Sequence, residues 1–175
     1  MIHNILIGDA NRYVLNFHEG LLQQAGYKVV LAEDLSAVST QLRLATFSLV
    51  ISELALPGAG PADALNVIRL VTTLRPGTPI LVLTSNSNPA VHRKARRLGV
   101  WDITVKPTHC AELLSLTENI LDAAYPGNSG GLGHLLPDAA TGETVSSALD
   151  RFQGLATFAN GEGRSSRSLI RASIS

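Results

Sequence analysis

The 175-residue sequence has a single cysteine, Cys110, and only 16% of its residues are charged. One cysteine excludes an intramolecular disulfide and any zinc site built from several cysteines. Fourteen Lys and Arg balance fourteen Asp and Glu, so no overall field attracts nucleic acid or an anionic membrane. The first apolar run reaches Asp9 and is far too short for a signal-peptide core or a membrane span. These absences predict a soluble, cytoplasmic protein.

Hydrophobic residues, in contrast, make up 45% of the chain, which is enough for a sizeable core in one ordinary domain. Apolar segments of strand length alternate with amphipathic segments of helix length, a pattern typical of repeated β–α units. We expect strands at 4–8, 27–32, 47–52, 79–83 and 101–105, each followed by a helix, with the third helix beginning near Pro61. The pattern predicts an α/β fold, a doubly wound parallel sheet of five strands with helices on both faces.

The composition changes after Tyr125. Residues 126–133 are rich in glycine, as in a flexible linker, and residues 163–175 are rich in serine and arginine, as in disordered segments. Between them, residues 143–156 have the apolar spacing of one amphipathic helix. We therefore expect a domain at 1–124 and, at 125–175, a linker and mostly disordered tail with this one helix. The tail resembles no catalytic or helix-turn-helix output domain.

Polar residues stand at the carboxyl ends of four of the predicted strands. They are Asp9, Glu53, Thr84 and Lys106. In an open parallel sheet these ends converge on one crevice, so two acids, a hydroxyl and a lysine are expected to share it. Such a set suits a phosphoryl group, or a cation with its counter-charges.

Four motifs around these residues resemble, in order and spacing, those of response-regulator receiver domains. They are residues 5–11 (ILIGDAN), 47–58 (FSLVISELALPG), 80–85 (ILVLTS) and 98–107 (LGVWDITVKP). The resemblance covers about residues 3–123. It implies a flavodoxin-like fold of receiver type, with strand order 2-1-3-4-5, and a role in two-component phosphorelay signalling.

In receivers an aspartate accepts a phosphoryl group beside Mg²⁺, which that aspartate and an acidic pair hold. A threonine or serine and a lysine engage the phosphate, and an aromatic on the fifth strand switches inward. By this resemblance Thr84 and Lys106 match, and Asp9 matches the first acid of the pair. The phosphoacceptor, the second acid and the switching aromatic are replaced by Glu53, Ala10 and Ile103.

These departures predict a degenerate site without phosphorylation. Ala10 removes a carboxylate and Glu53 projects one methylene further than aspartate, so Asp9 and Glu53 should hold Mg²⁺ weakly at most, and no cofactor is required. In-line phosphoryl transfer depends on close positioning, which the displaced carboxylate does not provide. We expect Glu53 to pair with Lys106 instead and to lock the domain in one signalling state. The alternative is a solvated Glu53 in a decayed site.

A run of cations at 92–97 (HRKARR) falls on the predicted fourth helix. In receivers, the face formed by the fourth helix, the fifth strand and the fifth helix usually contacts partners or a second receiver. We therefore expect a candidate partner face that would dock onto an acidic protein surface. It is formed by Arg93, Lys94, Arg96 and Arg97. A solvated charged helix is the alternative. A histidine kinase, a downstream regulator and a second copy of the chain are the candidate partners; nucleic acid and membrane are not expected.

The sequence thus predicts a non-enzymatic, receiver-like signalling module that acts through protein–protein contacts. One alternative is an active receiver that accepts phosphate through an unusual site. Another is an α/β nucleotide-binding protein or enzyme, although no glycine-rich phosphate loop follows the first strand. The neutral net charge and the short tail argue against a DNA-binding regulator.

Overall fold

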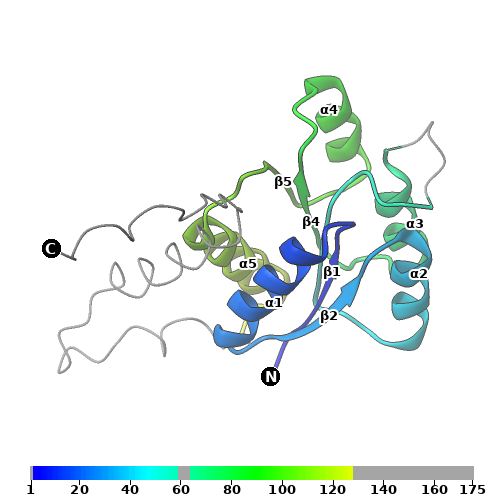
Figure 1. Cartoon of the computed structure of the whole chain (residues 1–175). Coiled ribbons are helices and arrows are strands. Elements are labelled where there is room, and N and C mark those ends of the chain that lie inside the picture. Colours follow the sequence, from blue (N-terminus) through cyan, green and yellow to red (C-terminus); the bar gives the residue numbers. More distant parts are fainter. Residues whose placement is uncertain (1, 59–63, 128–175) are drawn as a thin grey trace, which may run out of the picture.

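The computed structural model describes residues 2–58 and 64–127, which form a parallel sheet between two layers of helices (Figure 1). The sheet has five strands in the order β2-β1-β3-β4-β5, and every neighbouring pair is parallel. The strands are β1 (Asn4–Gly8), β2 (Lys28–Ala32), β3 (Leu49–Ser52), β4 (Ile80–Thr84) and β5 (Asp102–Val105). The predicted doubly wound fold and its strand order are confirmed.

Five helices in the described part of the chain cover the two faces of the sheet. They are α1 (Arg12–Gln24), α2 (Leu35–Leu44), α3 (Asn66–Leu74), α4 (Pro89–Arg97) and α5 (Cys110–Ala124). Alternate strand residues point to opposite faces, so Ile5 and Ile7 pack with α1 and α5 while Leu6 packs on the side of α2 and α3. Every residue of β3 and β4 is buried, as expected for central strands covered on both faces.

The third helix begins later than predicted. Ala64 and Leu65 form a turn, and the helix starts at Asn66, with no side-chain hydrogen bond from Leu65 at the N-cap. Pro61 itself lies outside the described residues. The prediction near Pro61 was wrong because the fixed φ of proline permits a first helical turn without requiring one.

The tail predicted at 125–175 lies almost entirely outside the described residues, which end at 127. The linker, the helix at 143–156 and the division into domain and tail therefore stay predictions. Within the described residues, none of the helices combines the length and the apolar character that crossing a membrane requires.

The turns at the carboxyl edge of the sheet are set by side-chain caps. Asn11 accepts hydrogen bonds from the backbone N–H groups of Tyr13 and Val14 at the start of α1. Asn88 accepts from the N–H of Ala90 at the start of α4. Capping fixes the direction in which each helix leaves its strand, so the residues at the strand ends are held in place.

Gly8 ends β1 where it approaches β3 closely. A Cβ added at Gly8 would lie 2.8 Å from Ser52 Oγ, and the side chains of Leu56 and Val38 would be 3.2 and 3.3 Å away. The Ser52 hydroxyl donates to the carbonyl of Glu53 at 2.9 Å, so it is not free to move aside. The absence of a side chain at Gly8 therefore positions β1 against β3 directly below the candidate site.

We predict that Gly8→Ala lowers the free energy of unfolding by about 1–3 kcal/mol, because the added methyl group overpacks this contact. Gly20→Ala on α1 is the matched control, since a Cβ there meets nothing within 4 Å. The control should be neutral or stabilising by up to about 1 kcal/mol, as alanine favours a helix over glycine. Urea unfolding of both variants checks this, and equal effects would contradict it.

Candidate functional site

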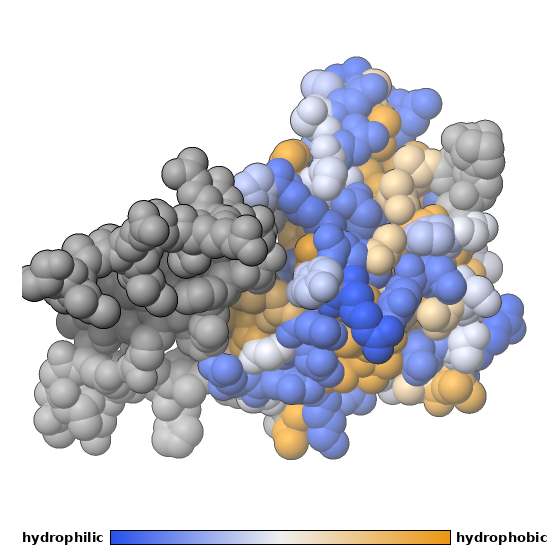
Figure 2. Space-filling view, viewed as in Figure 1, coloured by the Kyte–Doolittle hydropathy of each residue, from blue (hydrophilic) through white to orange (hydrophobic). Residues whose placement is uncertain are grey.

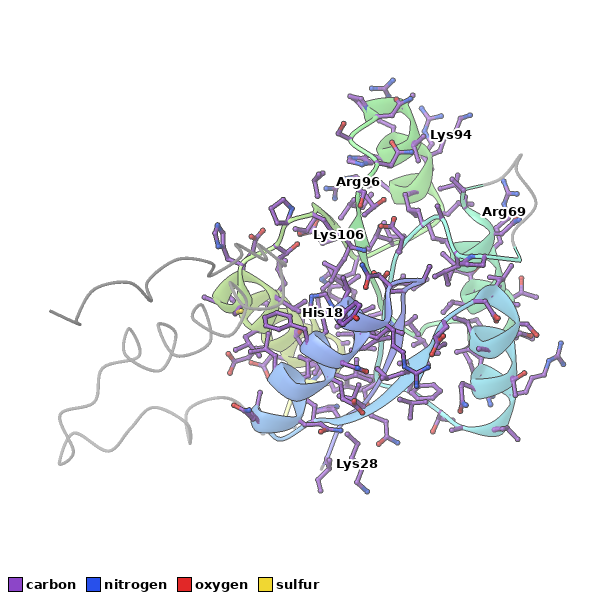
Figure 3. All side chains as sticks on the ribbon, viewed as in Figure 1. His18, Lys28, Arg69, Lys94, Arg96 and Lys106 are labelled. Atoms are coloured by element: carbon purple, nitrogen blue, oxygen red, sulfur yellow. The ribbon has the colours of Figure 1, made fainter. Side chains whose placement is uncertain are left out.

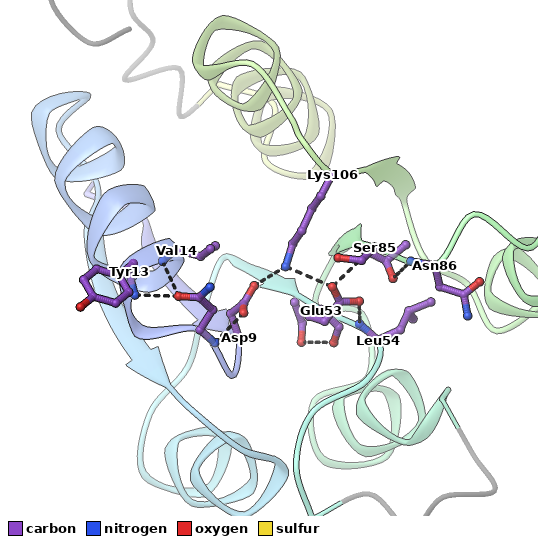
Figure 4. Close-up of polar contacts among 11 residues, drawn as sticks. Asp9, Tyr13, Val14, Glu53, Leu54, Ser85, Asn86 and Lys106 are labelled. Carbon is purple, nitrogen blue, oxygen red and sulfur yellow. Dashed lines mark hydrogen bonds and ion pairs between the residues drawn. The ribbon is translucent and has the colours of Figure 1, made fainter. Parts of the chain in front are cut away.

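The sequence-predicted residues meet at the carboxyl edge of the sheet. Asp9 follows β1, Glu53 follows β3, Thr84 ends β4 and Lys106 follows β5. Figure 3 shows Lys106 at this edge, and Figure 4 shows its side chain reaching between Asp9 and Glu53. The predicted contact between Glu53 and Lys106 is present.

One ammonium group bridges two carboxylates. Lys106 Nζ contacts Asp9 Oδ2 and lies 3.1 Å from Glu53 Oε2. The Asp9 and Glu53 side chains are only 8% and 12% exposed, and that of Lys106 is 21% exposed. Burial of this extent reduces screening by water, so these pairs interact more strongly than ion pairs on the surface.

Backbone donors complete the hydrogen bonding of both carboxylates. Asp9 Oδ1 accepts from the N–H of Asn11 at 2.8 Å. Glu53 Oε1 accepts from the N–H of Leu54 at 2.8 Å, and Oε2 also accepts from the N–H of Ser85 at 3.0 Å. Each of the four carboxylate oxygens thus has a donor, which offsets the cost of burying charge.

The protonation state of Glu53 follows from the same contacts. Burial raises the pKa of its carboxyl, but a hydrogen bond from the Thr84 hydroxyl, the charge of Lys106 and the Leu54 N–H lower it further than burial raises it. The net effect is a pKa below the ordinary value. Glu53 is therefore an anion at neutral pH.

Thr84 also organises the loop that follows β4. Its hydroxyl oxygen accepts from the N–H of Asn86 at 3.1 Å, and its carbonyl accepts from the N–H of Lys106 at 2.9 Å. Because Ser85 donates to Glu53, this loop is tied to both β3 and β5. The sequence showed Thr84 but not these backbone donors, since any residue supplies an N–H group.

His18 was missed by sequence reasoning. It lies on α1 (Figure 3) and is buried, with a pKa lowered to about 4 by burial and by the positive charge of Lys106, against an opposing effect of Asp9. A single histidine within an apolar helical repeat gives little signal, because it is also compatible with a core position. At neutral pH the imidazole is therefore uncharged, and it lies close enough to Lys106 and Asp9 to be affected by their charges.

The other two positions singled out by the sequence bear no polar group at the site. Ala10 is exposed and contributes no oxygen ligand. Ile103 is half-buried and packs against the apolar cluster on the side of α2 and α3. Its role as a switch position stays a prediction.

The residues present do not fit the Mg²⁺ site that the resemblance implies. Within residues 2–58 and 64–127, no three His, Cys, Asp or Glu side chains come together as a metal site. The two carboxylates at the strand ends, Asp9 and Glu53, already share the Lys106 ammonium. Mg²⁺ demands near-octahedral oxygen ligation, and here the Lys106 ammonium already pairs with one oxygen of each carboxylate.

The basic run is exposed on α4, where the space-filling view is predominantly hydrophilic (Figure 2). Arg96 pairs with Asp102 of β5 at 3.2 Å, whereas no ion pair is formed by Arg93, Lys94 or Arg97 with the described residues. Trp101, next to β5, is 47% exposed. The four cations therefore differ: Arg96 pairs with Asp102 of β5, and the other three are exposed without an ion pair to the described residues.

Comparison with known proteins identifies the family. The profile described as "Response regulator receiver domain" matches residues 5–118. The transcriptional regulatory protein FixJ of Bradyrhizobium diazoefficiens is 29% identical over 126 residues, which cover 71% of this chain and 58% of that protein. The CAI-1 autoinducer sensor kinase/phosphatase CqsS of Vibrio cholerae is 31% identical over 111 residues, 63% of this chain and 16% of that protein. The chain thus spans less than two thirds of either relative.

Solved structures support the same fold. A CheY-like receiver domain protein from Methanospirillum hungatei superimposes with a TM-score of 0.66 at 21% identity, covering 71% of this chain and 97% of that one. The chemotaxis response regulator CheY4 of Vibrio cholerae gives a TM-score of 0.62 at 24% identity, covering 69% and 99%.

We predict that His18 makes the protein less stable in mild acid. The unfolded chain binds a proton near pH 6.5 and the folded state only near pH 4, so stability falls as the pH drops through this interval. His18→Leu should reduce the loss of unfolding free energy between pH 7 and pH 4 by up to about 3 kcal/mol. Urea unfolding between pH 7 and 4 measures it. An unchanged slope in His18→Leu would refute the assignment.

Proposed function

The chain belongs to the response regulator receiver domain family of two-component signalling, and from this premise we propose that Glu53 holds it in one signalling state. On this proposal Glu53 occupies the phosphoacceptor position, is not phosphorylated, and leaves the module to act through protein contacts. Receiver domains are signalling modules that generally lack enzymatic activity, which supports a non-enzymatic role. A receiver unit at 1–124 and a cytoplasmic location belong to the same proposal.

The contacts of the Glu53 carboxylate are the observation that carries the proposal. It accepts hydrogen bonds from the Ser85 N–H at 3.0 Å and lies 3.1 Å from Lys106 Nζ. In receivers the residues after the fourth and fifth strands engage the phosphoryl group. Here a permanent side-chain anion already engages both, so no added charge is needed to hold these loops.

The same contacts argue against phosphoryl transfer to Glu53. Both oxygens of its carboxylate accept backbone hydrogen bonds, which orient them toward Leu54 and Ser85. Ala10 offers no ligand for a metal that would neutralise an incoming phosphate. A decayed, solvated Glu53 is disfavoured because its side chain is 12% exposed and fully hydrogen-bonded.

The cations of α4 indicate the chemistry of the partner. Arg93, Lys94 and Arg97 are exposed on α4, and Trp101, the residue before β5, is also partly exposed. An acidic protein surface with an apolar contact for the indole complements this face. A histidine kinase or a downstream regulator is the proposed partner, and a second copy of the chain is the other candidate.

We predict that the wild type gains no phosphoryl mass when incubated with Mg²⁺ and a small phosphodonor. The matched variant Glu53→Asp with Ala10→Asp should gain one phosphoryl group, because it restores the acceptor and the second acid of the family pattern. Intact-mass spectrometry under both conditions decides. A labile adduct on the wild type would contradict the proposal, as would a double variant that stays unmodified.

We predict that reversing the charges of Arg93, Lys94 and Arg97 together to Glu weakens binding of poly-L-glutamate at least about tenfold. The chain has one tryptophan, Trp101, whose emission is expected to change when a ligand binds across α4 and the start of β5. The control reverses two exposed cations elsewhere, Lys28 on β2 and Arg43 on α2, and should bind as the wild type does. Equal losses in the two variants, or binding that leaves Trp101 emission unchanged, would refute the face.

A further inference from the structure

We propose that the Lys106 ammonium is the resident cation of this site and excludes a divalent ion from it. The inference rests on the proposed function only for the role of the site. The ion pairs that carry it do not depend on whether Glu53 is phosphorylated.

The position of Nζ is the first argument. It contacts Asp9 Oδ2 and lies 3.1 Å from Glu53 Oε2, so it pairs with one oxygen of each carboxylate. The outer oxygens are held by the backbone, Asp9 Oδ1 by Asn11 and Glu53 Oε1 by Leu54. A divalent ion therefore meets no free carboxylate oxygen. Asp9 Oδ2 and Glu53 Oε2 pair with Lys106, and the other two oxygens accept backbone hydrogen bonds.

The balance of charge is the second argument. Two carboxylates that are about nine-tenths buried repel each other unless a cation lies between them. One ammonium removes one unit of that charge, and the N–H groups of Leu54 and Ser85 with the Thr84 hydroxyl stabilise the Glu53 anion. A divalent ion added beside the ammonium would meet a like charge a few ångströms away in a poorly screened site.

The third argument is the cost of displacing the lysine. Mg²⁺ in proteins is usually held by one or two carboxylates, with waters completing its near-octahedral shell, and Ala10 adds no third carboxylate here. Asp9 and Glu53 would therefore have to give up Lys106 to hold the ion, which would leave its ammonium without an acceptor in a site where it is 21% exposed. Because the lysine is part of the chain, it is also present at high effective concentration. The tethered cation therefore outcompetes the free one.

It follows that the arrangement of β3, β5 and the loop after β4 does not depend on divalent cations. The cation that joins these elements is supplied by the chain itself, through Lys106. Removing its charge should expose two carboxylates that then accept a metal ion.

The experiment compares the wild type with Lys106→Met in calorimetric titrations with Mn²⁺ and in thermal unfolding with and without about 10 mM Mg²⁺. The wild type should show no binding heat and a midpoint that is unchanged within about 1 °C. Lys106→Met should bind Mn²⁺ and gain at least about 3 °C with Mg²⁺. Lys28→Met controls for the loss of a lysine at an exposed position.

Adding Asp9→Asn to Lys106→Met should abolish the gained metal response, because it removes one of the two carboxylates. Binding of Mn²⁺ by the wild type that Asp9→Asn abolishes would overturn the inference, and so would a folded Lys106→Met that binds no metal. If Lys106→Met unfolds, the wild-type titration decides alone: Mn²⁺ binding that Asp9→Asn abolishes overturns the inference, and its absence supports it. Phosphoryl mass is a separate readout, so failure here is distinguishable from failure of the proposed function.

Discussion

The bridge that Lys106 makes between Asp9 and Glu53 is the interaction on which the rest of the site depends. It joins the ends of β1, β3 and β5 through one ammonium group. A buried ion pair of this kind adds little net stability in general, since desolvation consumes most of the attraction. What it does provide is specificity, because loss of the Lys106 ammonium leaves two buried carboxylates without a counter-charge.

The architecture explains why three distant segments meet there. A parallel sheet places the carboxyl ends of all its strands at one edge, and the order β2-β1-β3-β4-β5 sets β1, β3 and β4 side by side. The close approach at Gly8 and the caps at Asn11 and Asn88 then set the positions of the turns. Glu53 connects this frame to the loop after β4, because its carboxylate accepts a hydrogen bond from the Ser85 N–H.

Much of this was predictable from the sequence, and the exceptions have physical reasons. Their positions after predicted strands identified Glu53 and Lys106. Because the two side chains carry opposite charges at the same edge of the sheet, their contact was also predicted. The sharing of Lys106 with Asp9 was not foreseen, because strand-end position does not say which of two acids a flexible lysine reaches. The donors Leu54 and Ser85 act through their backbones and leave no residue signature. His18 was hidden in an apolar helical repeat, where only the fold reveals the nearby charges.

The most direct test of the account is a double-mutant cycle of Glu53→Gln and Lys106→Met, measured by urea unfolding at neutral pH. The account predicts a coupling free energy of about 1–3 kcal/mol, as for a poorly solvated, hydrogen-bonded pair. The exposed pair Arg12–Glu33, with its charged groups 2.9 Å apart, is the control and should couple by less than about 1 kcal/mol. A Glu53–Lys106 coupling within about 0.3 kcal/mol of zero would contradict the claim that this ion pair holds the site together.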